Sequence, residues 1–404
     1  MPGISTGLNH SFGRSWYSHC LTDSALHSSM VFGAFAHQRV QSMLGNKLGL
    51  FNNSNISRQV MIAQIDSLSK VNRAMQDSAK ATSDPMILCV LCLATNDSPH
   101  NRSVGKSPFE PPLRSLQWLN IYGTSSPNPV HQAGLARIIE LCGGLNAIKL
   151  PGLAAVISFS DILGASRSLS RPKFPFVSLG NEGQSILQQI SRDEIDQSTL
   201  LDLEVTPEMH TALQDARAYV YLVERYIEGV YFGEPTMQIM SDSRNFVQWQ
   251  IMSLLPMSQL ALGSVIPTQP VRMLVYEACR LALITFGVGV IFPLPPQSAP
   301  LLQLARSLQM TLQLDADDRS RTGLLSFPRT EVKTRLWCLV LGGIAASGVH
   351  EREWFVDELK YFAAEHGFPM WNDIRVMLRS VLWFDGACNS AGEQLWSEVR
   401  CFED

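Results

Sequence analysis

Residues 206–233 read TPEMHTALQDARAYVYLVERYIEGVYFG, and this stretch decides the fold class. Its apolar residues recur at alternating spacings of three and four, which places them along one face of a helix with 3.6 residues per turn. Thr206 and Pro207 suit the first positions of a helix, and Gly229 and Gly233 offer an end. The apolar face comprises Leu213, Ala216, Val220, Val223, Ile227 and Val230.

The same periodicity extends over most of the chain, whereas alternating apolar and polar runs, which would indicate strands, are scarce. The sequence therefore predicts an all-α fold, a large domain of antiparallel packed helices. A second clear stripe consists of Met61, Ile65, Leu68, Val71 and Met75. Further helical segments are expected at residues 23–43, 131–141, 271–292, 331–346, 351–366 and 372–383.

The domain organisation follows from where the periodicity fails. With 404 residues, of which 46% are hydrophobic, the chain can bury one continuous core. We expect an irregular N-terminal segment over residues 1–21 and a single helical domain over residues 22–404. Pro, Gly, Ser and Asn concentrate near residues 96–112 and 166–182, where we expect loops.

The charge pattern argues against a nucleic-acid surface. The formal net charge is -4, and no two Lys or Arg residues are adjacent. Phosphate-backbone binding relies on clustered cations, which usually appear as basic runs. We therefore do not expect direct DNA binding.

The cysteines and apolar segments suggest a protein that is neither secreted nor membrane-spanning. Eight scattered cysteines lie mostly in apolar surroundings, as in a reducing compartment. The first twenty residues lack the apolar core of a signal peptide. The longest apolar stretch, residues 281–295, is shorter than the roughly 20 residues of a spanning helix, so we expect a buried helix.

Cys89 and Cys92 form a C-x-x-C pair within the apolar run PMILCVLCLA. A metal or redox site would need a second ligand pair, or a thioredoxin-like strand and helix. Because neither accompanies the pair, and because residues three apart share one helix face, the sequence predicts that both thiols pack in the core.

Two glycine motifs are incomplete matches. GISTG at residues 3–7 has the letters of a nucleophile elbow, but only two residues precede it where that motif needs a strand. GVGVIF at residues 287–292 has Phe292 where a dinucleotide site has its third glycine. Close helix packing is the better interpretation of the second motif.

The polar clusters lack the spacing of metal sites. The acidic runs RDEID (192–196) and DADD (315–318) are expected at solvated helix ends or loops. His19, His27 and His37 are eight and ten residues apart, which matches no helical or hairpin metal motif. We therefore predict no catalytic, cofactor-binding or metal-ligating residues, and no enzyme activity.

Residues 130–175 read VHQAGLARIIELCGGLNAIKLPGLAAVISFSDILGASRSLSRPKFP. This segment resembles the fungal-specific transcription factor domain, the C-terminal regulatory domain of fungal binuclear zinc cluster transcription factors. That family has a helix of the form H-x-x-G-L-x-x-x-(I/V)-x-x-x-G-G-L, then L-P-G-L, an apolar helix with an aspartate, and a Pro-containing exit. The family's arginine before the paired glycines is Cys142 here. The matching residues are His131, Gly134, Leu135, Ile139, Gly143, Gly144, Leu145, Leu150, Pro151, Gly152, Leu153, Asp161, Phe174 and Pro175.

Further fragments follow in family order, so that the resemblance covers most of the chain from about residue 23. They are EACRLALI (277–284), LWCLVLGGIAA (336–346), EREWFVDEL (351–359) and LWSEV (395–399), with Trp371, Leu378, Trp383 and Cys388 among them. The resemblance implies a nuclear regulator of transcription that acts through dimer contacts, co-regulators or a small-molecule effector. Family members bind zinc through six closely spaced N-terminal cysteines, but this chain has only Cys20 before Cys89, so we expect no zinc cofactor.

Three functional hypotheses remain open at this point. The leading one is a transcription-regulatory domain, either a fragment of a longer factor or a relative without the zinc cluster. An all-α enzyme or carrier that binds an apolar small molecule is the alternative, motivated by the apolar content and the Phe-, Trp- and Met-rich helices. A pure interaction scaffold, with the face around Val223 exposed for a partner, is the third.

Overall fold

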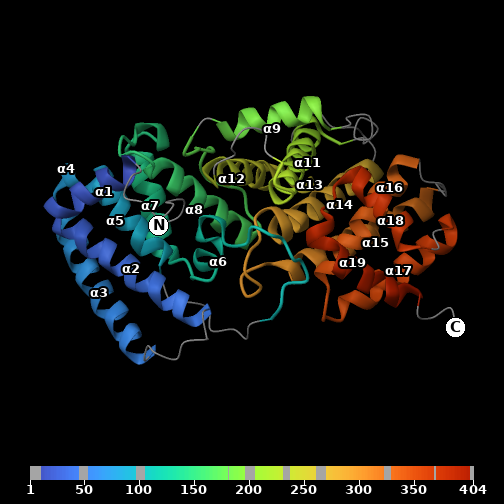
Figure 1. Ribbon diagram of the computed structural model, residues 1–404, viewed down its shortest axis with the longest axis horizontal. Coiled ribbons are helices and arrows are strands. Elements are labelled where there is room, and N and C mark those ends of the chain that lie inside the picture. The colour runs from blue at the N-terminus through green and yellow to red at the C-terminus, as the bar shows by residue number, and fades with distance from the viewer. Residues whose placement is uncertain are drawn as a thin grey trace.

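The computed structural model describes residues 11–44, 53–96, 105–180, 182–195, 205–230, 237–260, 270–322, 329–367 and 370–400. These residues form helices joined by turns and loops, without a strand among them (Figure 1). The all-α prediction is therefore confirmed for the described part of the chain.

The N-terminal helices lie at one end of the molecule, drawn in blue and teal in Figure 1. They are α1 (Ser11–Thr22), α2 (Ser24–Leu44), α3 (Asn53–Ala74), α4 (Ser78–Ala81), α5 (Asp84–Thr95), η1 (Leu116–Trp118), α6 (Leu119–Tyr122), α7 (Pro129–Leu141) and η2 (Leu145–Ala147). Next in the chain, α8 (Leu153–Ser168), α9 (Glu182–Asp193), α11 (Pro207–Ile227) and α12 (Met237–Ser253) occupy the middle of the view.

The C-terminal helices gather at the opposite end, drawn in orange and red (Figure 1). Before them comes the short helix α13 (Met257–Leu260). The helices are α14 (Pro270–Phe286) with its π-helical continuation η3 (Gly287–Ile291), α15 (Leu301–Thr322), α16 (Arg329–Ala345), α17 (Glu351–His366), α18 (Trp371–Val381) and α19 (Asp385–Arg400).

The buried apolar side chains form two clusters. The N-terminal core is formed by residues of α1, α2, α3, α5, α7, η2 and the first turns of α8. The C-terminal core is formed by residues of η1, α6, the later turns of α8 and the helices that follow α8 in the chain. The helix α8 belongs to both, since Leu153 and Ile157 pack in the N-terminal core and Ile162 in the C-terminal core. This helix therefore joins the two cores.

The segment that decides the fold class forms α11 much as predicted. The Thr206 hydroxyl oxygen accepts the N–H of Met209 at 3.3 Å, and Gly229 ends the helix with a φ of 73°. Leu213, Ala216, Val220 and Val223 are buried, so this face lies in the C-terminal core rather than exposed for a partner. Ile227 and Val230, beyond the packed turns, are exposed, and Gly233 lies outside the described residues.

The predicted segment boundaries change in two places. Residues 11–22 form a helix where an irregular segment was expected, because Trp16 is buried in the N-terminal core and its Nε1 donates to the Pro151 carbonyl at 2.8 Å. The loop expected from residue 166 begins after Ser168, because Ser166 is buried and accepts a hydrogen bond from Gln248 at 2.9 Å. Both changes come from contacts with distant parts of the chain.

Two apolar segments also differ from the predictions. Met61 and Ile65 of the predicted stripe are 56% and 60% exposed, whereas Val71 is buried as predicted. The other buried apolar residues of α3 are Ile56, Val60 and Ala63. The apolar segment at α14 and η3 is longer than expected: its 19 residues from Met273 to Ile291 have the length and hydropathy of a membrane span. Since 78% of this window is buried inside the molecule, core packing is the better interpretation.

A buried arginine holds the turn at η1. Arg244 of α12 is fully buried and donates to the Leu116 carbonyl at 2.8 Å and to Gln117 Oε1 at 2.6 Å. Its guanidinium also lies over the Phe292 ring, 4.9 Å from the centroid. Gln117 and Trp118 have φ values of 55° and 59°, an unusual conformation for residues with a side chain. Arg244 thus stabilises a strained turn that presents Trp118.

Candidate ligand-binding pocket

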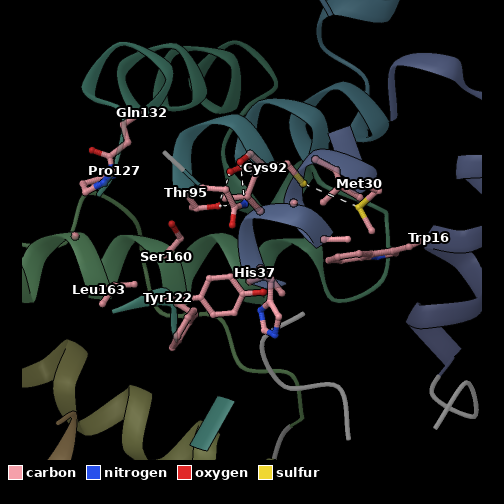
Figure 2. A pocket seen from close by; sticks show the side chains of 18 of the residues that line it. Trp16, Met30, His37, Cys92, Thr95, Tyr122, Pro127, Gln132, Ser160 and Leu163 are labelled. Atoms are coloured by element: carbon pink, nitrogen blue, oxygen red, sulfur yellow. Dashed lines mark hydrogen bonds between the residues drawn. The ribbon is translucent and has the colours of Figure 1, made fainter. Parts of the chain in front are cut away.

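A cavity of about 410 Å³ lies between the N-terminal and C-terminal cores (Figure 2). Its wall includes Leu88, Leu91 and Cys92 of the N-terminal core and Phe159 and Leu163 of the C-terminal core. Small-molecule sites commonly occupy such internal boundaries and have volumes of roughly 300–1,000 Å³. We call this cavity the core pocket.

The helix α8 supplies one continuous wall of the core pocket. Phe159, Ser160, Leu163, Gly164 and Arg167 line it, at spacings that place them on one helix face. A Cβ added at Gly164 would have only Gln132 Nε2 within 4 Å, at 3.8 Å. The glycine therefore leaves open space where another residue would fill the pocket.

The turn between α7 and α8 follows from the glycines of the quoted segment. Gly143 and Gly144 have φ values of 93° and 92°, and the Gly144 N–H donates to the Ile139 carbonyl at 2.9 Å, which ends α7. Gly152, with a φ of 77°, directly precedes α8, which begins at Leu153. These left-handed positions turn α8 back along the pocket.

Two carboxylates hold the segments on either side of α8. Asp84, in the first turn of α5, accepts the N–H groups of Lys149 and Leu150 at 2.7 and 2.6 Å. Asp161 accepts the N–H groups of Lys173 and Phe174 at 2.7 and 2.9 Å. Asp161 therefore holds the Pro-containing exit against α8, and the structure gives this residue a positioning role.

One end of the core pocket is apolar. In Figure 2, Trp16 and Met30 lie at one side of the pocket, and Pro127 and Gln132 at the other. The Cys92 thiol lies 4.0 Å from the Met30 sulfur, so the soft side chains gather near Trp16. This end offers a ligand only apolar contact and aromatic rings.

His37 is a titratable group of the pocket whose pKa is strongly lowered. Its ring lies 4.4 Å from the Trp118 ring and 5.9 Å from the Tyr122 ring, centroid to centroid. Burial lowers the pKa of His37 to about 4, so the imidazole is neutral at pH 7. Its Nδ1 is buried without a hydrogen-bond partner within the described part of the chain.

Arg167 lies at the other end of the α8 wall. Its Nη2 donates to the Tyr122 carbonyl at 2.6 Å, whereas its Nε is buried and finds no partner among the described residues. Burial lowers the pKa of Arg167 to about 10, so it stays charged at pH 7. The pocket therefore has a cation at the end away from Trp16.

The titratable groups of the pocket are not poised for acid–base chemistry near neutral pH. Burial raises the pKa of the Cys92 thiol and of the Tyr122 hydroxyl far above their usual values. No carboxylate stands among the described residues that line the core pocket. A general acid or base would need a pKa near the working pH.

The cysteines and histidines considered in the sequence analysis lie only partly at the core pocket. Cys89 and Cys92 are both buried in α5, as predicted, and only Cys92 reaches the pocket. Of the three histidines only His37 lines it, while His19 and His27 are exposed elsewhere. The described residues contain no group of three or more potential metal ligands.

Two further motif predictions have clear outcomes. The glycines of GVGVIF lie in η3, where a Cβ at Gly289 would come within 2.4 Å of the Phe109 ring, which supports close packing. The prediction of a solvated position was wrong for Asp315, which is buried within α15 and pairs with Arg335 at 3.4 Å. Residues 3–7 lie outside the described residues.

The later fragments of the resemblance meet in the C-terminal core. Arg352 of α17 forms two hydrogen bonds of 2.8 Å with the Glu398 carboxylate of α19 and donates to the Gly343 carbonyl of α16 at 2.8 Å. Trp371 of α18 packs against Gly392 of α19, where an added Cβ would clash with the indole. Fragments far apart in sequence are thus mutual packing partners.

No protein-family model, no curated protein and no solved structure matches this chain.

Proposed function

We propose that this chain is a transcription-regulatory domain of the fungal type that it resembles, and that its core pocket receives a small apolar effector. The observation that supports this proposal is the position of residues 130–175, the segment that resembles the family. These residues form α7, α8 and the exit segment held by Asp161. Seven residues of this segment line the core pocket: Gln132, Val156, Phe159, Ser160, Leu163, Gly164 and Arg167.

Regulation fits the chemistry of the pocket better than catalysis. An effector needs a largely apolar cavity with a few polar groups, which His37 and Arg167 provide. Because the pocket lies between two cores joined by α8, a ligand bound there contacts both and favours arrangements that keep them together. In this proposal the domain acts in the nucleus and passes its state to co-regulators or a second copy, without reading DNA itself.

A reporter assay tests the proposal. The full chain is fused to an unrelated DNA-binding domain, and transcription from its operator is compared with that from the DNA-binding domain alone. Gly164→Leu fills the core pocket, and Gly134→Leu is the matched control, since Gly134 lies on the exposed side of α7. We expect the fusion to change transcription, Gly164→Leu to alter this effect severalfold, and Gly134→Leu to leave it unchanged.

The proposal is contradicted if the fusion transcribes as the DNA-binding domain alone does. It is equally contradicted if both leucine variants behave as the parent fusion. Circular dichroism and thermal unfolding of the purified chains show whether each variant is folded.

The core pocket also favours a second candidate, an apolar-ligand carrier. A carrier would bind a neutral apolar probe such as Nile red in the pocket, and Gly164→Leu would reduce this binding. Its fusion would show no transcriptional effect, so the reporter assay separates a carrier from a regulator.

A further inference from the structure

The core pocket does not end at Gln132. A second cavity, of about 540 Å³, adjoins it and is lined mainly by α8 and the exit segment after it. The two cavities share five wall residues: Pro127, Gln132, Ser160, Gly164 and Arg167. Since Pro127 and Gln132 lie opposite Trp16 and Met30 in Figure 2, the second cavity continues from the end away from Trp16. Together the cavities form one elongated site.

The second cavity carries positive charge. Arg171 and Lys173 are exposed along it, and Arg167 lies at the boundary with the core pocket. Asp161 is the one carboxylate among its described lining residues, and it already accepts two backbone N–H groups. Three cations against one engaged carboxylate favour an anionic group here.

Arg167 marks where that anionic group would lie. Its Nη2 is bonded to the Tyr122 carbonyl, but its buried Nε has no acceptor among the described residues. A buried donor without an acceptor is unfavourable, and a guanidinium is well shaped for a carboxylate. A carboxylate against this guanidinium would give it an ionic hydrogen-bond partner at the boundary of the two cavities.

The apolar wall of the core pocket determines which group of the ligand lies beyond the carboxylate. From Arg167 the wall continues through Leu163 and Phe159 to Leu88 and Leu91, and it ends near Trp16. These side chains offer a hydrocarbon chain apolar contact along its length and no partner for a second charged group.

We propose that the combined site binds an amphiphilic monoanion of the fatty-acid class. The carboxylate lies at Arg167, and the unbranched hydrocarbon chain extends toward Trp16 and Met30. This inference rests on the proposed effector pocket and names the chemical class of its ligand.

Calorimetric titration of the full chain tests the ligand class. The probes are octanoate, decanoate, dodecanoate, dodecan-1-ol and acetate, each below its aggregation concentration. We expect affinity to rise by about fourfold for each added methylene, from a transfer free energy of about 0.8 kcal/mol per buried methylene, until the core pocket is filled. Acetate, which has no chain, should not bind measurably, and dodecan-1-ol should bind more weakly than dodecanoate.

Variants of the cations test the position of the carboxylate. Arg167→Gln should weaken dodecanoate binding by about tenfold or more and leave dodecan-1-ol binding nearly unchanged, because the lost contact is a charge-assisted hydrogen bond. Arg167→Lys should restore part of the loss. Arg137→Gln, at an exposed arginine of α7 outside the cavity walls, is the matched control and should bind as the parent does.

A second substitution covers the case in which Arg167→Gln does not fold. Arg171 and Lys173 are both exposed, so the double variant Arg171→Gln/Lys173→Gln should fold normally. It should weaken dodecanoate severalfold, with a smaller effect at high salt.

The inference is overturned if dodecanoate and dodecan-1-ol bind equally, or if neither binds. It is also overturned if the cation variants lower the affinity for both probes alike. Either result leaves the reporter assay of the proposed function unaffected, since that assay depends on filling the pocket and not on ligand charge. Conversely, dodecanoate binding without a transcriptional effect would support the ligand class and favour the carrier.

Discussion

Arg244 shows at the residue scale how one buried charge organises the wall next to the pocket. Its donors face neutral acceptors, the Leu116 carbonyl and the side chains of Gln117 and Asn245. Burial lowers the pKa of Arg244 to about 10, so it remains charged at pH 7. The charge is stabilised by hydrogen bonds and by the Phe292 ring rather than by a bonded carboxylate.

Removing this charge should destabilise the fold. In Arg244→Met the buried Leu116 carbonyl loses its Arg244 donor, and Gln117 Oε1 keeps only the donor from Asn245. We expect the free energy of unfolding to fall by about 3 kcal/mol or more. Urea unfolding measures the change. Arg137→Met is the control, because its exposed ion pair with Glu140 contributes about 0–1 kcal/mol. Equal stability of the two variants would contradict this role for Arg244.

His37 should make stability depend on pH. Its pKa is about 4 in the folded chain, below its ordinary value of 6.5, so between these values the unfolded chain binds the proton and the folded chain does not. The free energy of unfolding should therefore fall as the pH drops from about 6.5 toward 4. In His37→Phe, which keeps a ring against Trp118, this fall should be smaller.

Urea unfolding at several pH values from 7 to about 4.5 measures the effect of His37. His27→Gln, at an exposed residue of the same helix, is the control and should keep the parent's pH dependence. If His37→Phe also kept it, the imidazole would not be held neutral by the pocket.

The pocket residues were only partly predictable from sequence. The sequence analysis considered Cys92 and His37, but only as members of the C-x-x-C pair and of the histidine cluster, and neither motif forms a metal site within the described residues. Trp16 and Arg167 carry no local signal, since their roles depend on contacts such as that between Trp16 and Pro151, which lie 135 positions apart. A single sequence shows periodicity along one helix but not which helices enclose a cavity.

At the scale of elements, the turn between α7 and α8 depends on backbone conformation. Gly144 has a φ of 92°, and the space that a Cβ would occupy there is open, so Gly144→Ala adds conformational strain without a clash. We expect it to lower the free energy of unfolding by about 1–2 kcal/mol. Gly134→Ala, in the middle of α7, should instead raise stability by about 0.5–1 kcal/mol. Thermal or urea unfolding distinguishes the two, and similar effects would contradict the left-handed turn.

Two apolar helix faces that look alike in sequence differ in the fold. Val223 of α11 is 3% exposed and Ile65 of α3 is 60% exposed. Val223→Glu should therefore unfold the chain or destabilise it by more than about 3 kcal/mol, whereas Ile65→Glu should change stability by about 0.5 kcal/mol or less. Circular dichroism with urea unfolding checks both. A folded, stable Val223→Glu variant would support an exposed face on α11.

Helix type and several helix ends were predictable because caps and periodicity are local. Asn128 accepts the N–H groups of Val130 and His131 at the start of α7, and Thr206 caps α11 in the same way. The buried face of α3 was only partly predictable. Val71 of the predicted stripe is buried, but in the earlier turns packing against α2 and α5 selects Ile56, Val60 and Ala63.

At the scale of the whole molecule, the two cores should respond together to a ligand. Dodecanoate in the combined site would contact α5 of the N-terminal core and α8, which joins both. We expect hydrogen exchange to slow in α5, α8 and α12, since α12 packs on α8, and to change little in α17 and α19. Mass spectrometry of exchanged peptides measures this. Slowing confined to α17 and α19 would place the ligand outside the boundary between the cores.

The open volume between the cores has a mechanical consequence. Unfolding eliminates internal voids, so the unfolded chain occupies less volume and hydrostatic pressure favours it. In this protein a void of about 410 Å³ lies along one boundary, beside the helix that both halves share. Pressure should therefore first disrupt the contacts along α8. The N-terminal and C-terminal cores should separate there before the apolar packing inside either core is lost. A hydrocarbon chain in that space would make the protein less compressible, so that resistance to pressure becomes a measure of occupancy.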